Sequence, residues 1–192
     1  MQANEPQIRR SNLTLWLVLA VCVAPFLAAV VVQRYFPPSS RMNYGELIEP
    51  APLADIELPT VENKPYSLKT LRGKWVMVMV DSGDCPPACV SKLWKLRQLR
   101  LTQGKNMDRI ERLWLVKDDA SIRPDLHKDY AGTIMLRAGR DIIRSLPTKT
   151  DPVENIWIVD PLGNVMMRYG QDADPSRMKN DLIRLLKVSQ IG

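Results

Sequence analysis

The longest apolar run in the chain lies near its start. Residues 13–32 include no charged side chain, and Thr14 is the one clearly polar residue among them. About 20 residues in a helix cross the roughly 30 Å hydrocarbon layer of a membrane. Pro25 is compatible with such a span, because membrane helices tolerate proline. The pattern therefore predicts a transmembrane helix over residues 13–34.

A cleaved signal peptide is the alternative interpretation of this run. Signal peptides carry an apolar region of about 7–15 residues that ends at a small-x-small site. This run is longer, and residues 33–36 after it resemble an interfacial anchor. We therefore expect the helix to be retained. Two arginines precede it and two follow it, so nearby charge leaves its orientation open.

Beyond the span, the apolar positions follow two different periods. Residues 75–80 are continuously apolar, which is typical of a strand buried on both faces. From Val90 to Leu101 the apolar residues recur at near-helical spacing, with basic residues between them at Lys92, Lys95, Arg97 and Arg100. Further strands are predicted at 110–116, 155–159 and 165–169, the last two joined as a hairpin by the turn residues 161–164.

The end of the chain predicts a closing helix. Asp174 is a suitable N-cap, Pro175 suits the first turn, and an apolar stripe follows at Met178, Leu182, Ile183 and Leu186. Residues 120–149 are mixed, and we expect one or two helices around a short strand at 133–136. The order of elements predicts an α/β protein with a thioredoxin-like fold, a mixed central sheet with helices on both faces.

The predicted organisation has four parts along the 192 residues. They are a cytoplasmic tail (1–12), a transmembrane anchor (13–34), a linker rich in proline and serine (35–52) and one folded domain (53–192). The net charge is +6, but basic residues alternate with acidic ones. We therefore expect no nucleic-acid binding, which needs clustered basic residues.

Two of the three cysteines are candidates for chemistry in water. Cys22 lies in the apolar span, whereas Cys85 and Cys89 come shortly after the strand predicted at 75–80. If a helix begins at Pro86, Cys85 lies at its start and Cys89 lies one turn later on the same face. The pair is then able to close as a disulfide or to share a soft metal ion. A purely structural disulfide is the alternative, although α/β proteins usually bind and react at the carboxyl ends of strands.

The neighbours of Cys85 predict a thiol that is only weakly acidified. A helix start stabilises a thiolate through the helix dipole and free N–H groups. Pro86 and Pro87 remove two of these donors, and Asp84 adds a nearby negative charge. We therefore expect a reductant or a metal ligand rather than a strong oxidant, and a measured Cys85 pKa well below about 6 contradicts this hypothesis.

From about Leu53 to Val188 the chain resembles the SCO/SenC family of membrane-anchored, thioredoxin-fold proteins that help deliver copper to cytochrome c oxidase. The resemblance rests on residues 64–68 and 71–76, on the C-x-x-x-C spacing of Cys85 and Cys89, on residues 156–163, and on the closing helix after Asp174. It implies a single-pass protein of the bacterial inner membrane with its C-terminal domain in the periplasm.

The family's copper site uses both cysteines and one histidine, and that histidine is missing here. The family pattern places Pro152 at its position. Thioredoxins carry a cis-proline at about this place, so the resemblance makes Pro152 a candidate site residue, with an ordinary turn as the alternative. His127, the only histidine, lies in a charged segment that we expect to be exposed. Met166 and Met167 are expected to be one core residue and one surface neighbour rather than ligands.

Three functions remain open from the sequence. In the leading one, Cys85 and Cys89 perform thiol–disulfide exchange with a cytochrome c oxidase subunit or a copper chaperone. In the second, the same cysteines bind Cu(I), which makes copper the one cofactor candidate. In the third, the domain is a non-catalytic factor in oxidase assembly. Asp118 and Asp119 follow a predicted strand, and we expect them to form a solvated loop.

Overall fold

The computed structural model describes residues 8–35 and 43–189, which fall into two compact units, Met1–Met42 and Asn43–Gly192. In the first unit, helix α1 (Ile8–Tyr35) contains the apolar span Leu13–Val32, which is long and apolar enough to cross a membrane. None of that span is buried in the protein. The predicted apolar helix is therefore present, and residues 1–7 of the predicted tail lie outside the described residues.

The second unit is built on a six-stranded mixed sheet with the order β1-β8-β7-β4-β5-β6. Strands β4, β5 and β6 run parallel, whereas β7 is antiparallel to β4, and β8 is antiparallel to both β7 and β1. The strands of this sheet are β1 (Glu46–Pro52), β4 (Trp75–Asp81), β5 (Ile110–Val116), β6 (Thr133–Arg137), β7 (Asn155–Val159) and β8 (Asn164–Gly170). A separate two-stranded sheet pairs β2 (Glu57–Pro59) with β3 (Pro65–Ser67).

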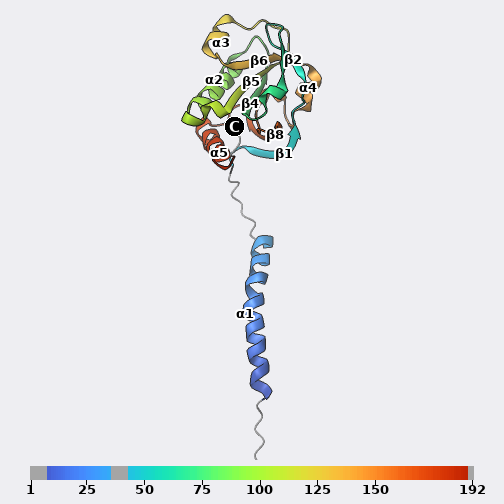
Figure 1. Ribbon diagram of the computed structural model, residues 1–192, viewed down its shortest axis with the longest axis vertical. Helices are drawn as coiled ribbons and strands as arrows, with labels where there is room; N and C mark the ends of the chain where they lie inside the picture. Colours follow the sequence, from blue (N-terminus) through green and yellow to red (C-terminus); the bar gives the residue numbers. More distant parts are fainter. Residues whose placement is uncertain (1–7, 36–42, 190–192) are drawn as a thin grey trace, which may run out of the picture. The chain divides into compact units, whose positions relative to one another are not determined.

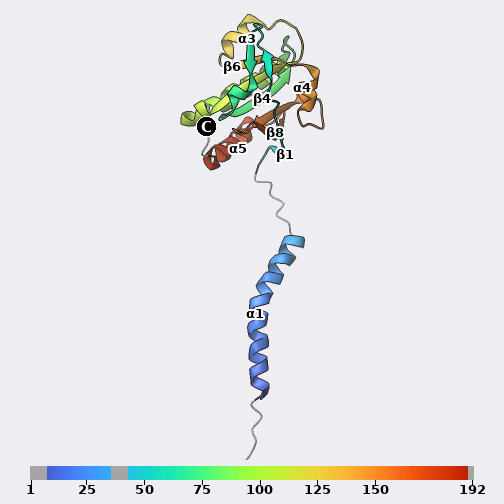
Figure 2. The same ribbon diagram turned by 45° about the vertical axis from the view of Figure 1, so that its right-hand side comes forward.

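Helices lie on both faces of the six-stranded sheet (Figures 1 and 2). The two views agree that α2 and α5 lie on one side and α4 on the other. The α-helices of this unit are α2 (Pro87–Leu101), α3 (Pro124–Asp129), α4 (Arg140–Ser145) and α5 (Pro175–Val188). Three short 3-10 helices complete it: η1 (Leu68–Leu71), η2 (Gly104–Arg109) and η3 (Pro152–Glu154).

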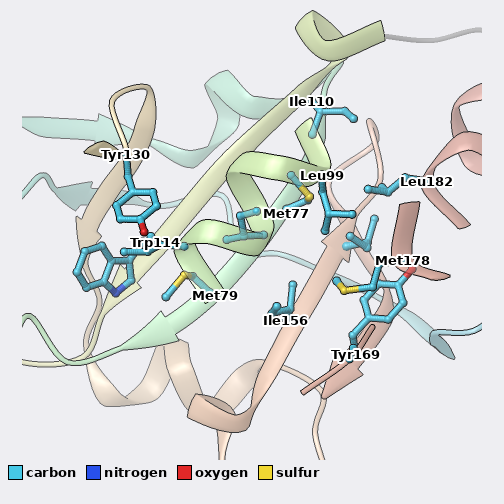
Figure 3. Packing of buried hydrophobic residues seen from close by; sticks show 14 of the residues in the cluster. Met77, Met79, Leu99, Ile110, Trp114, Tyr130, Ile156, Tyr169, Met178 and Leu182 are labelled. Carbon is cyan, nitrogen blue, oxygen red and sulfur yellow. The ribbon is translucent and has the colours of Figure 1, made fainter. Parts of the chain in front are cut away.

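Every residue of β4 is buried, as its continuous apolar sequence predicts. Alternate side chains of this strand point to opposite faces and enter two hydrophobic clusters, one under α2 and α5 and the other under α4 and η1. Figure 3 shows the first cluster, in which Met77 and Met79 of β4 lie between Trp114 and Tyr130 at one end and Tyr169 and Met178 at the other. The thioredoxin-like α/β architecture predicted from the sequence is confirmed.

The predicted linker (35–52) is wrong over its last part, and its residues 36–42 lie outside the described residues. Residues Glu46–Pro52 form strand β1 at the edge of the main sheet, paired with β8. Pro50 and Pro52 weaken the sequence pattern of a strand, yet proline is acceptable on an edge strand because one side of it needs no partner. The register of β1 shifts between Leu47 and Ala51, close to the first of these prolines.

The start of the domain is fixed to α5 by one buried carboxylate. Asp181 is 1% exposed and accepts hydrogen bonds from the backbone N–H groups of Tyr44 and Gly45 at 3.1 and 2.8 Å. It also accepts one from the Tyr169 hydroxyl at 3.1 Å. Burial and the nearby Asp181 carboxylate raise the pKa of Tyr169, so this hydroxyl stays protonated and keeps donating.

Candidate functional site

Cys85 and Cys89 are joined as a disulfide, with their Cα atoms 5.1 Å apart. Cys85 lies in the loop that follows β4, and Cys89 lies in the first turn of α2. The disulfide is therefore at the carboxyl end of a central parallel strand, the edge where ligand and reaction sites of α/β folds gather. The structure brings together the two cysteines that the sequence singles out.

The disulfide is enclosed. Cys85 is 3% exposed and Cys89 is 0% exposed, and both belong to the cluster under α2. The residues between them, Pro86–Ala88, are exposed, as is Asp84. Neither sulfur-bearing residue therefore presents much surface to an incoming thiol.

The loop that carries Cys85 is tightly turned. Cys85 has φ +45°, in the left-handed region that residues other than glycine rarely adopt. A turn supports this conformation, since the Cys85 N–H donates to the Ser82 carbonyl at 3.1 Å and the Asp84 N–H donates to the Ser82 hydroxyl at 3.2 Å. Such a backbone costs about 1–3 kcal/mol and persists where the surroundings impose it.

Helix α2 begins at Pro87, with Pro86 as the N-cap residue. The helix therefore starts one residue later than the sequence analysis assumed, and Cys85 lies just before it. Pro86 and Pro87 supply no N–H, and Pro86 makes no side-chain cap. The local geometry agrees with a modest stabilisation of a Cys85 thiolate by the helix start.

A buried lysine lies one turn after Cys89. Lys92 is 0% exposed, and its Nζ lies 2.7 Å from Asp81 Oδ2. It also donates to the carbonyl oxygens of Val80 at 2.8 Å and Val153 at 2.5 Å. Burial lowers the pKa of Lys92, while the Asp81 carboxylate acts in the opposite direction. Lys92 thus connects the end of β4, the cysteine helix and η3.

The sequence pattern placed Lys92 on the solvent side of the helix, and that interpretation is wrong. Trp94 and Leu101, which the pattern assigned to the apolar face, are each 49% exposed. A buried lysine needs a buried acceptor, and Asp81 at the end of an otherwise apolar strand is the signal that pointed to one.

A second loop packs against the cysteine loop. Asp118 follows β5, and its Oδ1 accepts from the Gly83 N–H at 2.9 Å and from the Ala120 N–H at 3.3 Å. Burial acts to raise the pKa of Asp118, but the N–H donors of Gly83 and Ala120 and the Ser82 hydroxyl outweigh it and leave the pKa below its ordinary value. Asp119 is fully exposed, so the expectation of a solvated loop is right for Asp119. It holds only in part for Asp118, which lies in the loop but is half-buried.

Pro152 begins η3 at the same edge of the sheet as the cysteines. Its neighbour Val153 is bound by Lys92, and the Asp151 carboxylate caps η3 by accepting from the Val153 N–H at 2.9 Å. No peptide bond among the described residues is cis, so the Asp151–Pro152 bond is trans. The cis alternative considered for Pro152 is wrong, and the ordinary turn is what the chain adopts.

The donor set available to a copper ion is two thiols. The described residues contain no group of three or more His, Cys, Asp or Glu side chains that could hold a metal. His127 is exposed on α3 and lies within electrostatic range of Glu62, before β3. Met167 is buried and Met166 is half-buried, as expected for a core residue and its neighbour. Two cysteine sulfurs suit Cu(I) once the disulfide is reduced.

The fold matches solved structures of copper-binding and thioredoxin-like proteins. Yeast Sco1 with copper bound is 18% identical, with a TM-score of 0.61 over 74% of this chain and 96% of that one. Bradyrhizobium japonicum ScoI with copper bound is 20% identical, with a TM-score of 0.54 over 70% of this chain and 99% of that one. A putative thioredoxin from Neisseria meningitidis is 16% identical, with a TM-score of 0.55 over 72% and 91%. At these identities the likeness establishes the fold.

A search of curated protein sequences finds no matching relative. Residues 75–189 match the family model described as a transmembrane-like, thioredoxin-like, C-terminal domain. The match begins at the first residue of β4 and continues past the end of α5, so it contains the disulfide, Lys92 and Asp118. On that match, the chain belongs to the transmembrane-like, thioredoxin-like C-terminal domain family.

Proposed function

We propose that this protein is a membrane-anchored thiol–disulfide exchange protein that works through Cys85 and Cys89. The observation that supports this most directly is the Cys85–Cys89 disulfide at the carboxyl end of β4, in a thioredoxin-like fold. Helix α1 would hold the domain at the bacterial inner membrane, with the domain in the periplasm. A compartment that permits disulfides agrees with the oxidised pair.

The exchange begins from the reduced protein. The Cys85 thiolate attacks one sulfur of a partner disulfide, and the other partner sulfur leaves as a thiolate and takes up a proton. The Cys89 thiolate then attacks the Cys85 sulfur, which forms the Cys85–Cys89 bond and releases the second partner thiol. Two electrons pass to the partner, and the two protons lost by Cys85 and Cys89 balance those gained by the partner.

The fold neighbours suggest which partner to test. Yeast Sco1 and Bradyrhizobium japonicum ScoI were both solved with copper bound. A thiol partner that must keep its own cysteines reduced to receive copper, such as a cytochrome c oxidase subunit or a copper chaperone, fits this chemistry. The role proposed for Pro152 is to shape the turn beside the cysteines, since its neighbour Val153 is bound by the buried Lys92.

The test uses the full chain in detergent micelles with Cys22→Ala, which removes the third thiol. The Cys89→Ser variant should form a stable mixed disulfide between Cys85 and glutathione when it meets oxidised glutathione. The Cys85→Ser variant should react at least tenfold more slowly, because Cys89 is held in the first turn of α2 with no exposed surface, whereas Cys85 lies in the loop before the helix. Mass spectrometry of the intact chain measures both. Equal reactivity of the two variants would contradict the assigned roles.

A second candidate function is the delivery of Cu(I), which the two sulfur donors favour. Here copper is cargo held between the Cys85 and Cys89 thiolates. An anaerobic Cu(I) titration of the reduced full chain with Cys22→Ala, in competition with a chelator, decides between the two. Tight binding of one Cu(I) per chain favours delivery. Weak binding that Pro152→His strengthens favours thiol–disulfide exchange, because the variant supplies the family's missing third ligand.

A further inference from the structure

One backbone group of the cysteine loop is bound by a carboxylate from a distant part of the chain. The Gly83 N–H donates to Asp118 Oδ1 at 2.9 Å. Gly83 and Asp118 are 35 residues apart in sequence. Asp118 therefore ties the loop before Cys85 to the loop after β5.

The two loops are in direct backbone contact at this point. A Cβ atom added to Gly83 would lie 2.3 Å from the carbonyl oxygen of Ala120, closer than any real contact. The Ala120 N–H donates to the same Asp118 Oδ1, at 3.3 Å. One oxygen atom thus accepts from both loops and holds them at the distance that glycine permits.

The loop after β5, which carries Asp118, is hydrogen-bonded to both neighbouring strands. The Lys117 N–H donates to the Asp81 carbonyl at 3.0 Å, and Arg137 Nη1 donates to the Asp118 carbonyl at 2.7 Å. Asp81 and Arg137 belong to β4 and β6 on either side of β5. Any movement that uncovers Cys85 involves the cysteine loop, because that loop carries Cys85.

Access to the disulfide requires such a movement. With Cys85 3% exposed and Cys89 0% exposed, an attacking thiolate has almost no surface to approach. The rate of thiol–disulfide exchange depends on access to the attacked sulfur as well as on the chemistry of the thiols. The strength of the Asp118 contacts should therefore govern how often the Cys85 sulfur becomes reachable.

We propose that Asp118 is a positioning residue that holds the cysteine loop closed over the Cys85–Cys89 disulfide and limits the rate at which a thiol reaches it. The inference deepens the proposed function, since it concerns access to the same disulfide. It concerns the shielding of the oxidised protein, which any thiol reductant must overcome, and needs no natural partner for its test.

The test reduces the oxidised full chain, carrying Cys22→Ala, with dithiothreitol in detergent micelles. A dithiothreitol thiolate attacks Cys85 Sγ, and Cys89 leaves as a thiolate that takes up a proton. The second dithiothreitol thiol then displaces Cys85, which also takes up a proton, and the reagent becomes a cyclic disulfide. The second-order rate constant is measured by trapping free thiols at intervals, and the melting temperature is measured on the same samples.

We expect Asp118→Ala to raise this rate constant about tenfold, because a hydrogen-bonded charged acceptor for the loop is lost. Asp118→Asn keeps an oxygen acceptor and should give an intermediate rate. Asp160→Ala is the matched control, since Asp160 also accepts two backbone N–H bonds, from Leu162 and Asn164, at the opposite end of the sheet. It should change the rate less than twofold.

Three results would overturn the proposal. They are an unchanged or lower rate constant in both Asp118 variants, an equal rise in Asp160→Ala, and a rate that follows the melting temperature across all the variants. If Asp118→Ala fails to fold, Asp118→Asn decides alone. Failure of the glutathione test with Cys89→Ser would instead refute the exchange function and leave the dithiothreitol rates to be judged by themselves.

Discussion

At each end of the central sheet, one aspartate accepts hydrogen bonds from two backbone N–H groups of the loops, but the bonded residues are local at one end and distant at the other. At the hairpin end, between β7 and β8, Asp160 accepts from the N–H groups of Leu162 and Asn164 at 3.0 and 2.8 Å. At the cysteine end, Asp118 accepts from Gly83 and Ala120. Asp160 closes its own turn within four residues, whereas Asp118 joins two loops that are remote in sequence.

The ion pairs at the two ends differ in the same way. Near the hairpin turn, Arg72 Nη2 lies 2.7 Å from Asp55 Oδ2, and both side chains are 47% exposed. At the cysteine end, Lys92 and Asp81 lie at the same distance with side-chain exposures of 0% and 3%. The first pair is solvated, so it contributes little, while the second has no water to replace a lost partner.

The difference lies in how polar side chains are used at the two ends. The hairpin end also has contacts between distant segments, since the Leu53 N–H donates to the Gly163 carbonyl and the Gly73 N–H donates to the Pro161 carbonyl, each at 2.8 Å. These are backbone bonds, which side-chain substitutions leave in place. The cysteine end depends on single carboxylates and one lysine whose partners come from several elements. Changes of the same chemical type should therefore have unequal effects at the two ends.

The largest difference is expected between the two ion pairs. Lys92→Met leaves Asp81 as a buried charge without its partner and should lower the free energy of unfolding by about 3–5 kcal/mol. Arg72→Met should lower it by less than about 1 kcal/mol. Urea denaturation of the full chain in micelles, followed by tryptophan fluorescence, measures both. The Asp81→Asn, Lys92→Met double variant should recover part of the loss, and a double variant as unstable as the sum of the single ones would contradict the pairing.

The next difference is expected between two glycines. Gly83→Ala drives a Cβ against backbone atoms of Ala120, so it should cost about 2–3 kcal/mol. Gly163 has φ +92° but no neighbour closer than 3.8 Å to an added Cβ, so Gly163→Ala should cost only about 1 kcal/mol for its left-handed backbone. Thermal unfolding monitored by circular dichroism measures which of the two variants is the less stable. A Gly163→Ala variant less stable than Gly83→Ala would show that the loop contact is looser than described.

Reduction of the disulfide should loosen the backbone at the cysteine end of the sheet and leave the hairpin end unchanged. Closing the short loop between Cys85 and Cys89 is worth about 2 kcal/mol through the entropy of the unfolded chain. Hydrogen exchange should show faster exchange of the Gly83, Asp84 and Cys85 amides after reduction, and unchanged protection of the Leu162 and Asn164 amides. Loss of protection at both ends would mean that reduction loosens the whole sheet.

The smallest effect on stability is expected from protonation of Asp118 at low pH. The pKa of Asp118 is lowered in the folded protein, so its contribution to stability is present above its ordinary pKa and is lost as the pH falls through the lowered value, below about 4. The melting temperatures of the wild-type chain and of Asp118→Asn should therefore converge as the pH falls below about 4. A difference between them that stays constant from pH 7 to pH 3 would show that the charge of Asp118 has no part in holding the loop.

The sequence predicts the elements that local pattern determines. Strands β4, β5 and β7 lie where clusters of apolar residues predict them, although β5 also contains Glu111 and Arg112. Asp174 caps α5 by accepting from the Arg177 N–H at 2.9 Å. Strand β1 is not predicted because its sequence, ELIEPAP, contains two prolines and few apolar residues, as a linker does. Its pairing with β8 is what makes it a strand.

The cysteines are predictable from their spacing, but their surroundings are not. The sequence pattern predicts Lys92 as a surface lysine. In the folded chain it is buried because two acceptors lie beside it, Asp81 and the carbonyl of Val153, and Val153 is 61 residues away in sequence. The sequence does not predict the bond that Asp118 makes, because its partner Gly83 lies in another loop, 35 residues away. Both depend on contacts that no local pattern encodes.

The prolines of β1 affect how molecules of this protein meet one another. An exposed sheet edge offers its free N–H and C=O groups to the edge of a second molecule, which is the usual start of aggregation. Pro50 and Pro52 have no N–H to offer, and the shifted register between Leu47 and Ala51 interrupts any continuous ladder. The β1 edge is thus a poor template for strand pairing between two molecules. This suits a protein whose membrane anchor would hold many copies close together in the plane of the membrane.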